Sequence, residues 1–153
     1  MLSSLSIIYV SITAPDTLAP TIQGLSLGAS TLDPSQAGGA FLSGSLSFKD
    51  NLSGFYYAYL DFTSDSGQEQ NTSIYISSNE IISGSELSGV AFARTPVNAH
   101  AAAGTWRLSG LQLHDNANNS LYKKNTDSDW ATFLSSSGIT QTSFEVVYGI
   151  QYV

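Results

Sequence analysis

Apolar and polar residues alternate along most of this chain, in short runs separated by turn residues. The longest run follows Gly104, and its alternation slips by one residue at Gly110. A period of two residues is typical of a β-strand with one buried face, and a slip of one residue indicates a bulge. We therefore predict a long half-buried strand with a bulge at Gly110, ending in the turn residues 115–119. Its predicted inward residues are Trp106, Leu108, Leu111 and Leu113.

Further strands are predicted wherever the same period recurs between turn signals, namely over residues 21–27, 41–48, 55–62, 72–76, 90–94 and 142–148. We expect a bulge at Gly24 in the first of these. Only residues 127–134 show helical spacing, with Trp130, Phe133 and Leu134 on one stripe and Gly138 as the stop. This pattern predicts an all-β protein, a β-sandwich of about seven to nine antiparallel strands with one short helix near the C-terminus.

The first 15 residues are set apart from the rest. Residues 2–13 are apolar on both faces of a predicted strand, and Pro15 and Pro20 interrupt the pattern after it. No basic residue precedes Lys49, which favours a strand over a signal peptide. We expect residues 1–15 to be a strand and linker and residues 16–153 to be the sandwich domain. The strand belongs to a preceding module, pairs with another subunit, or is an ordinary first strand of the same sandwich.

Composition narrows the function classes. The 153 residues suit one domain, and 12 acidic against 5 basic residues give a net charge of -7, which disfavours a nucleic-acid partner. The chain has no Cys, so disulfides and thiolate chemistry are excluded, and no apolar run reaches the length of a membrane span. Only 11% of the residues are charged, and hydroxyl and amide side chains take their place. We expect an extracellular or cell-surface protein of bacterial type.

Three short motifs carry a resemblance to a known family. They are D-T-L-A-P at residues 16–20, D-N-L-S-G at residues 50–54, and G-T-W at residues 104–106 followed by D-N-A-N-N at residues 115–119. Together they resemble the immunoglobulin-like repeats of large bacterial surface and secreted proteins of the adhesin type, although Asn118 stands where that pattern has Gly. The resemblance covers roughly residues 16–149. It implies an immunoglobulin-like fold and a tandem structural or adhesive module that meets neighbouring modules or subunits end to end or by strand contacts, and it implies no catalysis.

The same motifs suggest a metal site. Asp16, Asp50 and Asp115 each flank a strand end, so a sandwich can bring them to one pole, where Asn116 and Asn118 would add neutral oxygens. Carboxylate, amide and carbonyl oxygens are the ligands that calcium prefers. The alternative is that these residues only close turns by accepting backbone hydrogen bonds. Both interpretations stay open, and calcium is the one cofactor we expect.

No sequence pattern for catalysis stands out. The two histidines, His100 and His114, have no Cys to complete a zinc site, and no nucleophile elbow is present. Asp61 with a nearby acid, Asp65 or Glu69, has the residue types of a glycosidase pair, yet acids on a strand and its turn are usually solvated. We therefore expect a protein that is not an enzyme.

An aromatic set keeps one alternative function open, a carbohydrate-binding module that recognises surface glycans. Exposed rings in a row stack on the faces of pyranose sugars, and three or more coplanar exposed rings on one sheet face would favour this alternative. The candidate rings are Tyr56, Tyr57, Tyr59, Tyr75, Tyr122 and Trp130.

Overall fold

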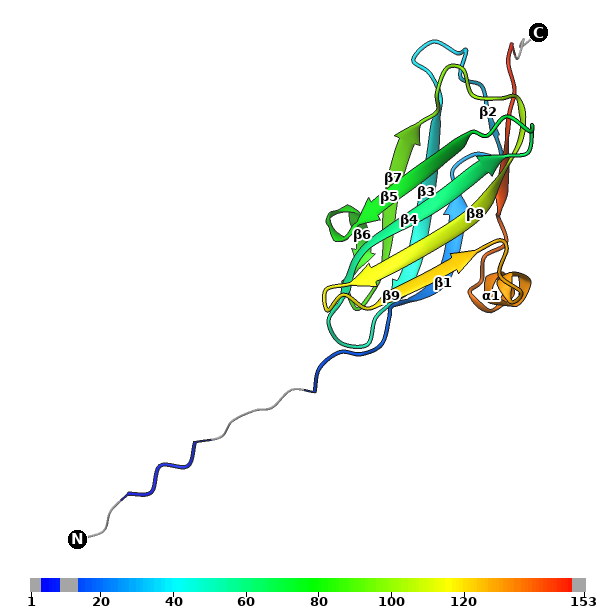
Figure 1. Ribbon diagram of the computed structural model, residues 1–153. Helices are drawn as coiled ribbons and strands as arrows, with labels where there is room; N and C mark the ends of the chain where they lie inside the picture. Colours follow the sequence, from blue (N-terminus) through cyan, green and yellow to red (C-terminus); the bar gives the residue numbers. More distant parts are fainter. Residues whose placement is uncertain (1–3, 9–13, 150–153) are drawn as a thin grey trace.

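Two β-sheets lie face to face in the computed structural model, which describes residues 4–8 and 14–149 (Figure 1). The first sheet has the strand order β1 (Thr21–Leu27), β3 (Phe41–Lys49), β7 (Ser88–Pro96), β6 (Ile81–Gly84). The second has the order β2 (Thr31–Leu32), β10 (Ser143–Val146), β8 (Gly104–Asp115), β4 (Phe55–Ser64), β5 (Asn71–Ser77), and β9 (Ser120–Lys124) also pairs with β8. All pairings are antiparallel except that of β2 with β10. The all-β prediction and the two-sheet sandwich are thereby confirmed.

Helical structure is confined to two short elements of the described chain, the 3-10 turn η1 (Ser78–Glu80) and the helix α1 (Trp130–Ser136). The helix begins three residues later than predicted, because the Asp127 carboxylate closes a turn with the backbone N–H of Lys124 instead of capping the helix. It ends at Ser136, two residues beyond the predicted end, and the predicted stop Gly138 follows with a φ of 65° in the left-handed region. Within the described residues, no helix has the length and apolar character of a membrane span.

The strand β8 lies at the centre of the second sheet. It pairs with β4 along one edge, and with β10 and then β9 along the other. Its register with β4 shifts where Asp61 faces Gly110 and Phe62 faces Leu108, which leaves Ser109 as the extra residue. The predicted bulge at Gly110 is therefore confirmed, as is the one at Gly24, where the pairing of β1 with β3 shifts.

The inward faces of both sheets form one hydrophobic core. The residues predicted to face inward from β8 are all buried, as are Leu42, Leu46 and Phe48 of β3. Phe48 stacks on Phe55 with ring centroids 4.3 Å apart, and this contact joins the two sheets near one end of the sandwich. The remaining aromatic core is formed by Phe62, Trp106 and Phe144.

The strand β4 departs from simple alternation at its start. The sequence pattern assigns Phe55 to the same face as Tyr57 and Tyr59, and Tyr56 to the opposite face. In the structure Phe55 is fully buried and Tyr56 is exposed, so this prediction was wrong. The cause is a second shift in register with β8 between Phe55 and Tyr57, which turns both Tyr56 and Tyr57 outward.

The described residues of the N-terminal segment form no regular element. Residues 4–8 lie away from the sandwich and are exposed, with Leu5 at 88% and Ile8 at 83% (Figure 1). The rest of the predicted first strand, residues 2–3 and 9–13, lies outside the described residues. Whether it pairs within the chain or with another subunit therefore stays a prediction.

We expect Leu111→Ala to lower the free energy of unfolding by about 2–5 kcal/mol, because Leu111 is fully buried at the centre of β8 and its loss leaves a cavity. Urea unfolding followed by tryptophan fluorescence measures the change. Gln112→Ala is the matched control, since the next side chain points to the outer face and should change stability far less. Equal losses for the two variants would contradict the assigned faces.

Candidate metal centre

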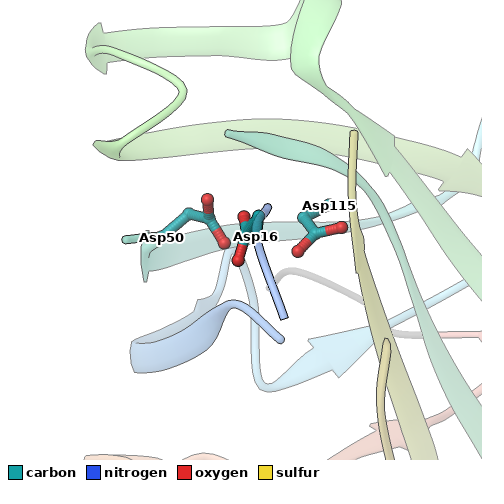
Figure 2. Close-up of side chains that lie close together, drawn as sticks. All are labelled: Asp16, Asp50 and Asp115. Atoms are coloured by element: carbon teal, nitrogen blue, oxygen red, sulfur yellow. The ribbon is translucent and has the colours of Figure 1, made fainter. Parts of the chain in front are cut away.

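Three aspartates from distant parts of the sequence meet at one pole of the sandwich. Asp50 directly follows β3 in the first sheet, Asp115 is the last residue of β8 in the second, and Asp16 lies in the linker before β1. One carboxylate oxygen of each lies within 4.8 Å of one from each of the others. Figure 2 shows the carboxylate of Asp16 between those of Asp50 and Asp115. The predicted convergence of these three residues is what the structure shows.

The Asp50 carboxylate uses its two oxygens differently. Its Oδ2 accepts hydrogen bonds from the backbone N–H groups of Leu52 at 3.1 Å and Gly54 at 2.7 Å, which closes the turn between β3 and β4. Its Oδ1 is buried and has no hydrogen-bond partner among the described residues, and the residue as a whole is only 9% exposed. Leaving a buried charged acceptor without a partner is costly, so this oxygen is suited to bind a cation.

Asp115 is buried more deeply and is bonded more completely. Its Oδ1 accepts the backbone N–H groups of Ala117 at 2.9 Å and Asn119 at 2.8 Å. Its Oδ2 accepts the Asn119 side-chain amide at 2.8 Å, and the residue is 1% exposed. Asp115 therefore closes the turn between β8 and β9, as the turn interpretation predicts, and the rigid strand β8 holds it in place.

Asp16 connects the linker to this pole. Its Oδ1 accepts the N–H of Leu18 at 3.1 Å, and its Oδ2 accepts the N–H of Ser53 at 2.8 Å. Hydrogen bonding from Ser53, whose backbone N–H donates to Oδ2, holds the pKa of Asp16 below its ordinary value, although burial acts in the opposite direction. The carboxylate is therefore negatively charged at neutral pH.

The asparagines of the last motif have separate roles in the two turns, and their role as metal ligands stays a prediction. Asn116 donates its side-chain amide to the carbonyls of Ser53 at 3.0 Å and Gly54 at 3.1 Å, so it joins the two turns. Asn118 is exposed and has a φ of 68°, the left-handed conformation that favours Gly. Asn119, which the sequence analysis missed, bonds both Asp115 Oδ2 and the carbonyl of Asp16.

The charge of the three aspartates is not balanced by a basic side chain. The two ion pairs formed by described residues, Arg107 with Asp65 and Lys123 with Asp129, involve none of them. Carboxylates this close together repel each other, and a divalent cation removes the repulsion. The donor set consists of oxygen atoms alone, which suits calcium or magnesium and not zinc or copper. The residues present therefore fit a hard divalent cation such as calcium or magnesium.

The acids, the histidine and the aromatic rings considered for other kinds of site do not belong to this cluster. Asp65 pairs with Arg107 at 2.5 Å, and Asp61 accepts the Ser73 hydroxyl at 2.5 Å. His114 lies on the outer face of β8, where its ring stacks on Tyr57 with centroids 4.4 Å apart. Of the aromatic set, Tyr56, Tyr59, Tyr75 and Tyr122 are exposed, whereas Trp130 packs against the core from α1.

Comparisons with protein-family models, with curated proteins and with solved structures found no match to this chain.

We expect Asn118→Ala to destabilise the protein by about 1 kcal/mol, because a Cβ without a polar group is disfavoured at a positive φ. Asn118→Gly should leave stability unchanged or raise it slightly, since Gly adopts this conformation without strain. Thermal melts of both variants in chelator measure the effect of the backbone conformation without any contribution from a bound cation. Equal destabilisation by Gly and Ala would show that the Asn118 side chain has another role.

Proposed function

We propose that this chain is a non-enzymatic structural or adhesive β-sandwich module of a larger bacterial surface protein, stabilised by a calcium ion at Asp16, Asp50 and Asp115. The observation that carries the proposal is the buried Oδ1 of Asp50, which has no hydrogen-bond partner. The carboxylates of Asp16 and Asp115 lie close to the Asp50 carboxylate. Turn closure alone accounts for Asp50 Oδ2 and for Asp115, but it leaves this oxygen unexplained.

The spacing of the carboxylates supports calcium. Two oxygens on opposite sides of a calcium ion are about 5 Å apart, because each lies about 2.3–2.6 Å from the metal. The three aspartate oxygens, all within 4.8 Å of one another, meet that limit without rearrangement. Calcium takes six to eight oxygen ligands in flexible geometry, so water and backbone carbonyls complete its shell.

The position of the site suggests a mechanical role. Asp50 ends a strand of the first sheet, Asp115 ends a strand of the second, and Asp16 belongs to the linker. A cation held by all three would tie the linker to both sheets at once. This is a useful property in a module that must keep a fixed direction relative to the chain before it. Calcium sites of extracellular modules have dissociation constants of about 10⁻⁴–10⁻³ M, which fits a location outside the cell.

The surface is consistent with this role and with the absence of catalysis. The acids considered as a catalytic pair are held by Arg107 and Ser73, as described above. Hydroxyl and amide side chains replace charges over much of the chain, and the net charge of -7 would keep neighbouring modules apart in solution.

We expect excess calcium to raise the melting temperature by about 5–10 °C over the value in chelator, when free calcium is roughly a hundredfold above its dissociation constant. Asp50→Asn should abolish this shift. The Asn oxygen can keep the two hydrogen bonds of Oδ2, and its amide group takes the place of the unpartnered oxygen, so the melting temperature in chelator should hold or rise.

The matched control is Asp33→Asn. Asp33 is also a buried, turn-closing aspartate, but it lies outside the cluster, so its variant should keep the full calcium shift. The same melting temperature for the native chain in calcium and in chelator would leave only the turn interpretation. A calcium shift that survives Asp50→Asn would place the ion elsewhere.

Calcium should also slow hydrogen–deuterium exchange in two peptides at once, residues 14–20 of the linker and residues 50–54 of the β3–β4 turn. The reason is that the Ser53 N–H bonds Asp16, so one ion would fix both segments. The turn of residues 65–70 is the internal control. Protection spread evenly over the chain would argue for general stabilisation without a clamped linker.

A further inference from the structure

We propose that the outer face of the second sheet binds a neutral glycan. The surface in question consists of the tyrosine face, formed by Tyr56, Tyr57, Tyr59, Tyr75 and Tyr122, and of a polar groove beside it. This proposal names a ligand class and a surface, and it does not depend on the calcium site.

The tyrosine face follows from strand pairing. Tyr75 of β5 is the partner of Tyr59 of β4, Tyr59 is also the partner of Gln112 of β8, and Gln112 is the partner of Tyr122 of β9. Partners across a sheet point to the same side, so this row crosses four strands on the outer face. The rings remain open to solvent, with Tyr59 at 36%, Tyr75 at 48% and Tyr122 at 52% exposure.

The rings support one another. Tyr59 and Tyr75 have centroids 5.0 Å apart with planes inclined by 50°, and Tyr57 lies 5.9 Å from Tyr75. The stack of Tyr57 on His114 fixes the base of this group. Because the rings are inclined and not coplanar, they do not form a flat platform. The condition of three coplanar exposed rings is therefore not met, and each exposed ring instead offers its own face to a separate pyranose unit.

The groove begins where the row of rings ends. Gly110, at the bulge of β8, has no side chain, so the outer surface is lowered at the centre of the sheet. The groove has a volume of about 510 Å³, which is within the range of ligand sites. Its lining consists of hydroxyl, amide and charged groups together with Tyr122: Asp61, Asn71, Ser73, Ser109 and Lys124.

The charges of the groove favour a neutral ligand. One carboxylate oxygen of Asp61 accepts the Ser73 hydroxyl, and the Lys124 ammonium group lies over the Tyr122 ring. Together these two residues give the lining both an acceptor and a donor without net charge. A sugar hydroxyl both donates and accepts, and it suits such a mixed lining. A polyanion would instead be repelled by a protein of net charge -7.

The two parts together match the two sides of a pyranose ring. The C–H face of a sugar is apolar and stacks on an aromatic ring, whereas its edge carries hydroxyl groups that need hydrogen-bond partners. Aromatic rings directly beside a polar groove supply both. On the first sheet, the exposed ring Phe92 lies on β7, apart from the tyrosine face, and is available as a control.

The test uses a panel of immobilised neutral hexasaccharides built from glucose, mannose, galactose, xylose and N-acetylglucosamine. The full chain is applied to this panel, and calorimetry then measures the affinity for each sugar that binds. Tyr59→Ala and Tyr75→Ala should each weaken binding by about fivefold to tenfold, and Tyr75→Phe should retain it, because stacking needs the ring and not the hydroxyl. Asp61→Ala should weaken binding through the groove. Phe92→Ala should have no effect.

Several outcomes would overturn the proposal. The first is no binding above background to any sugar of the panel, and the second is binding that the tyrosine variants leave intact. The third is self-association through the tyrosine face, which would appear as a concentration-dependent dimer that Tyr59→Ala abolishes. The Asp50→Asn variant distinguishes failure of the glycan proposal from failure of the calcium proposal. It should bind the same sugars as the native chain, so loss of the calcium shift and loss of sugar binding are independent results.

Discussion

The pairing of β4 with β8 is the interaction on which the other features depend. It sets the inward residues of both strands, so that Leu60 and Leu111 lie fully buried in one core. The same register turns Tyr57 and Tyr59 outward and leaves the bulge that lowers the surface at Gly110. At its end it places Phe55 opposite Asp115, where the aspartate is held at the pole. A shift of this register by one residue would exchange the core and the outer face together.

The alternation of apolar and polar residues predicted which side chains face inward wherever a strand is regular. It failed where a bulge adds one residue to a strand and no change in the sequence pattern marks that residue. The slip at Gly110 is visible because a small residue interrupts an otherwise strict pattern. Nothing comparable marks Tyr56, since Phe55, Tyr56 and Tyr57 are all aromatic and fit either face. The convergence of the aspartates was predictable because each flanks a strand end. The role of Asn119 was not, because one of its partners is the carbonyl of Asp16, 103 residues away in the sequence.

Turn closure and cation binding are compatible roles for the aspartates, because different oxygen atoms of one carboxylate can serve each role. A carboxylate has two acceptor atoms, and Asp50 uses one of them for the turn and leaves the other unpartnered. Turn closure holds that second oxygen in a fixed position before any ion arrives. Such preorganisation lowers the cost of assembling a site from three separate segments. It would also explain why turn residues occupy the positions of the proposed calcium ligands in this sequence.

The proposed cation site and the proposed glycan surface lie next to each other on β8, because Asp115 directly follows His114, whose ring stacks on Tyr57. The turn hydrogen bonds of Asp115 hold the end of β8 with or without a cation, so the tyrosine face keeps its support in either state. The linker enters at the same pole through Asp16. A cation there would fix the direction in which the tyrosine face is presented relative to the preceding chain. For an adhesive surface, that direction decides whether several modules can engage one ligand at the same time.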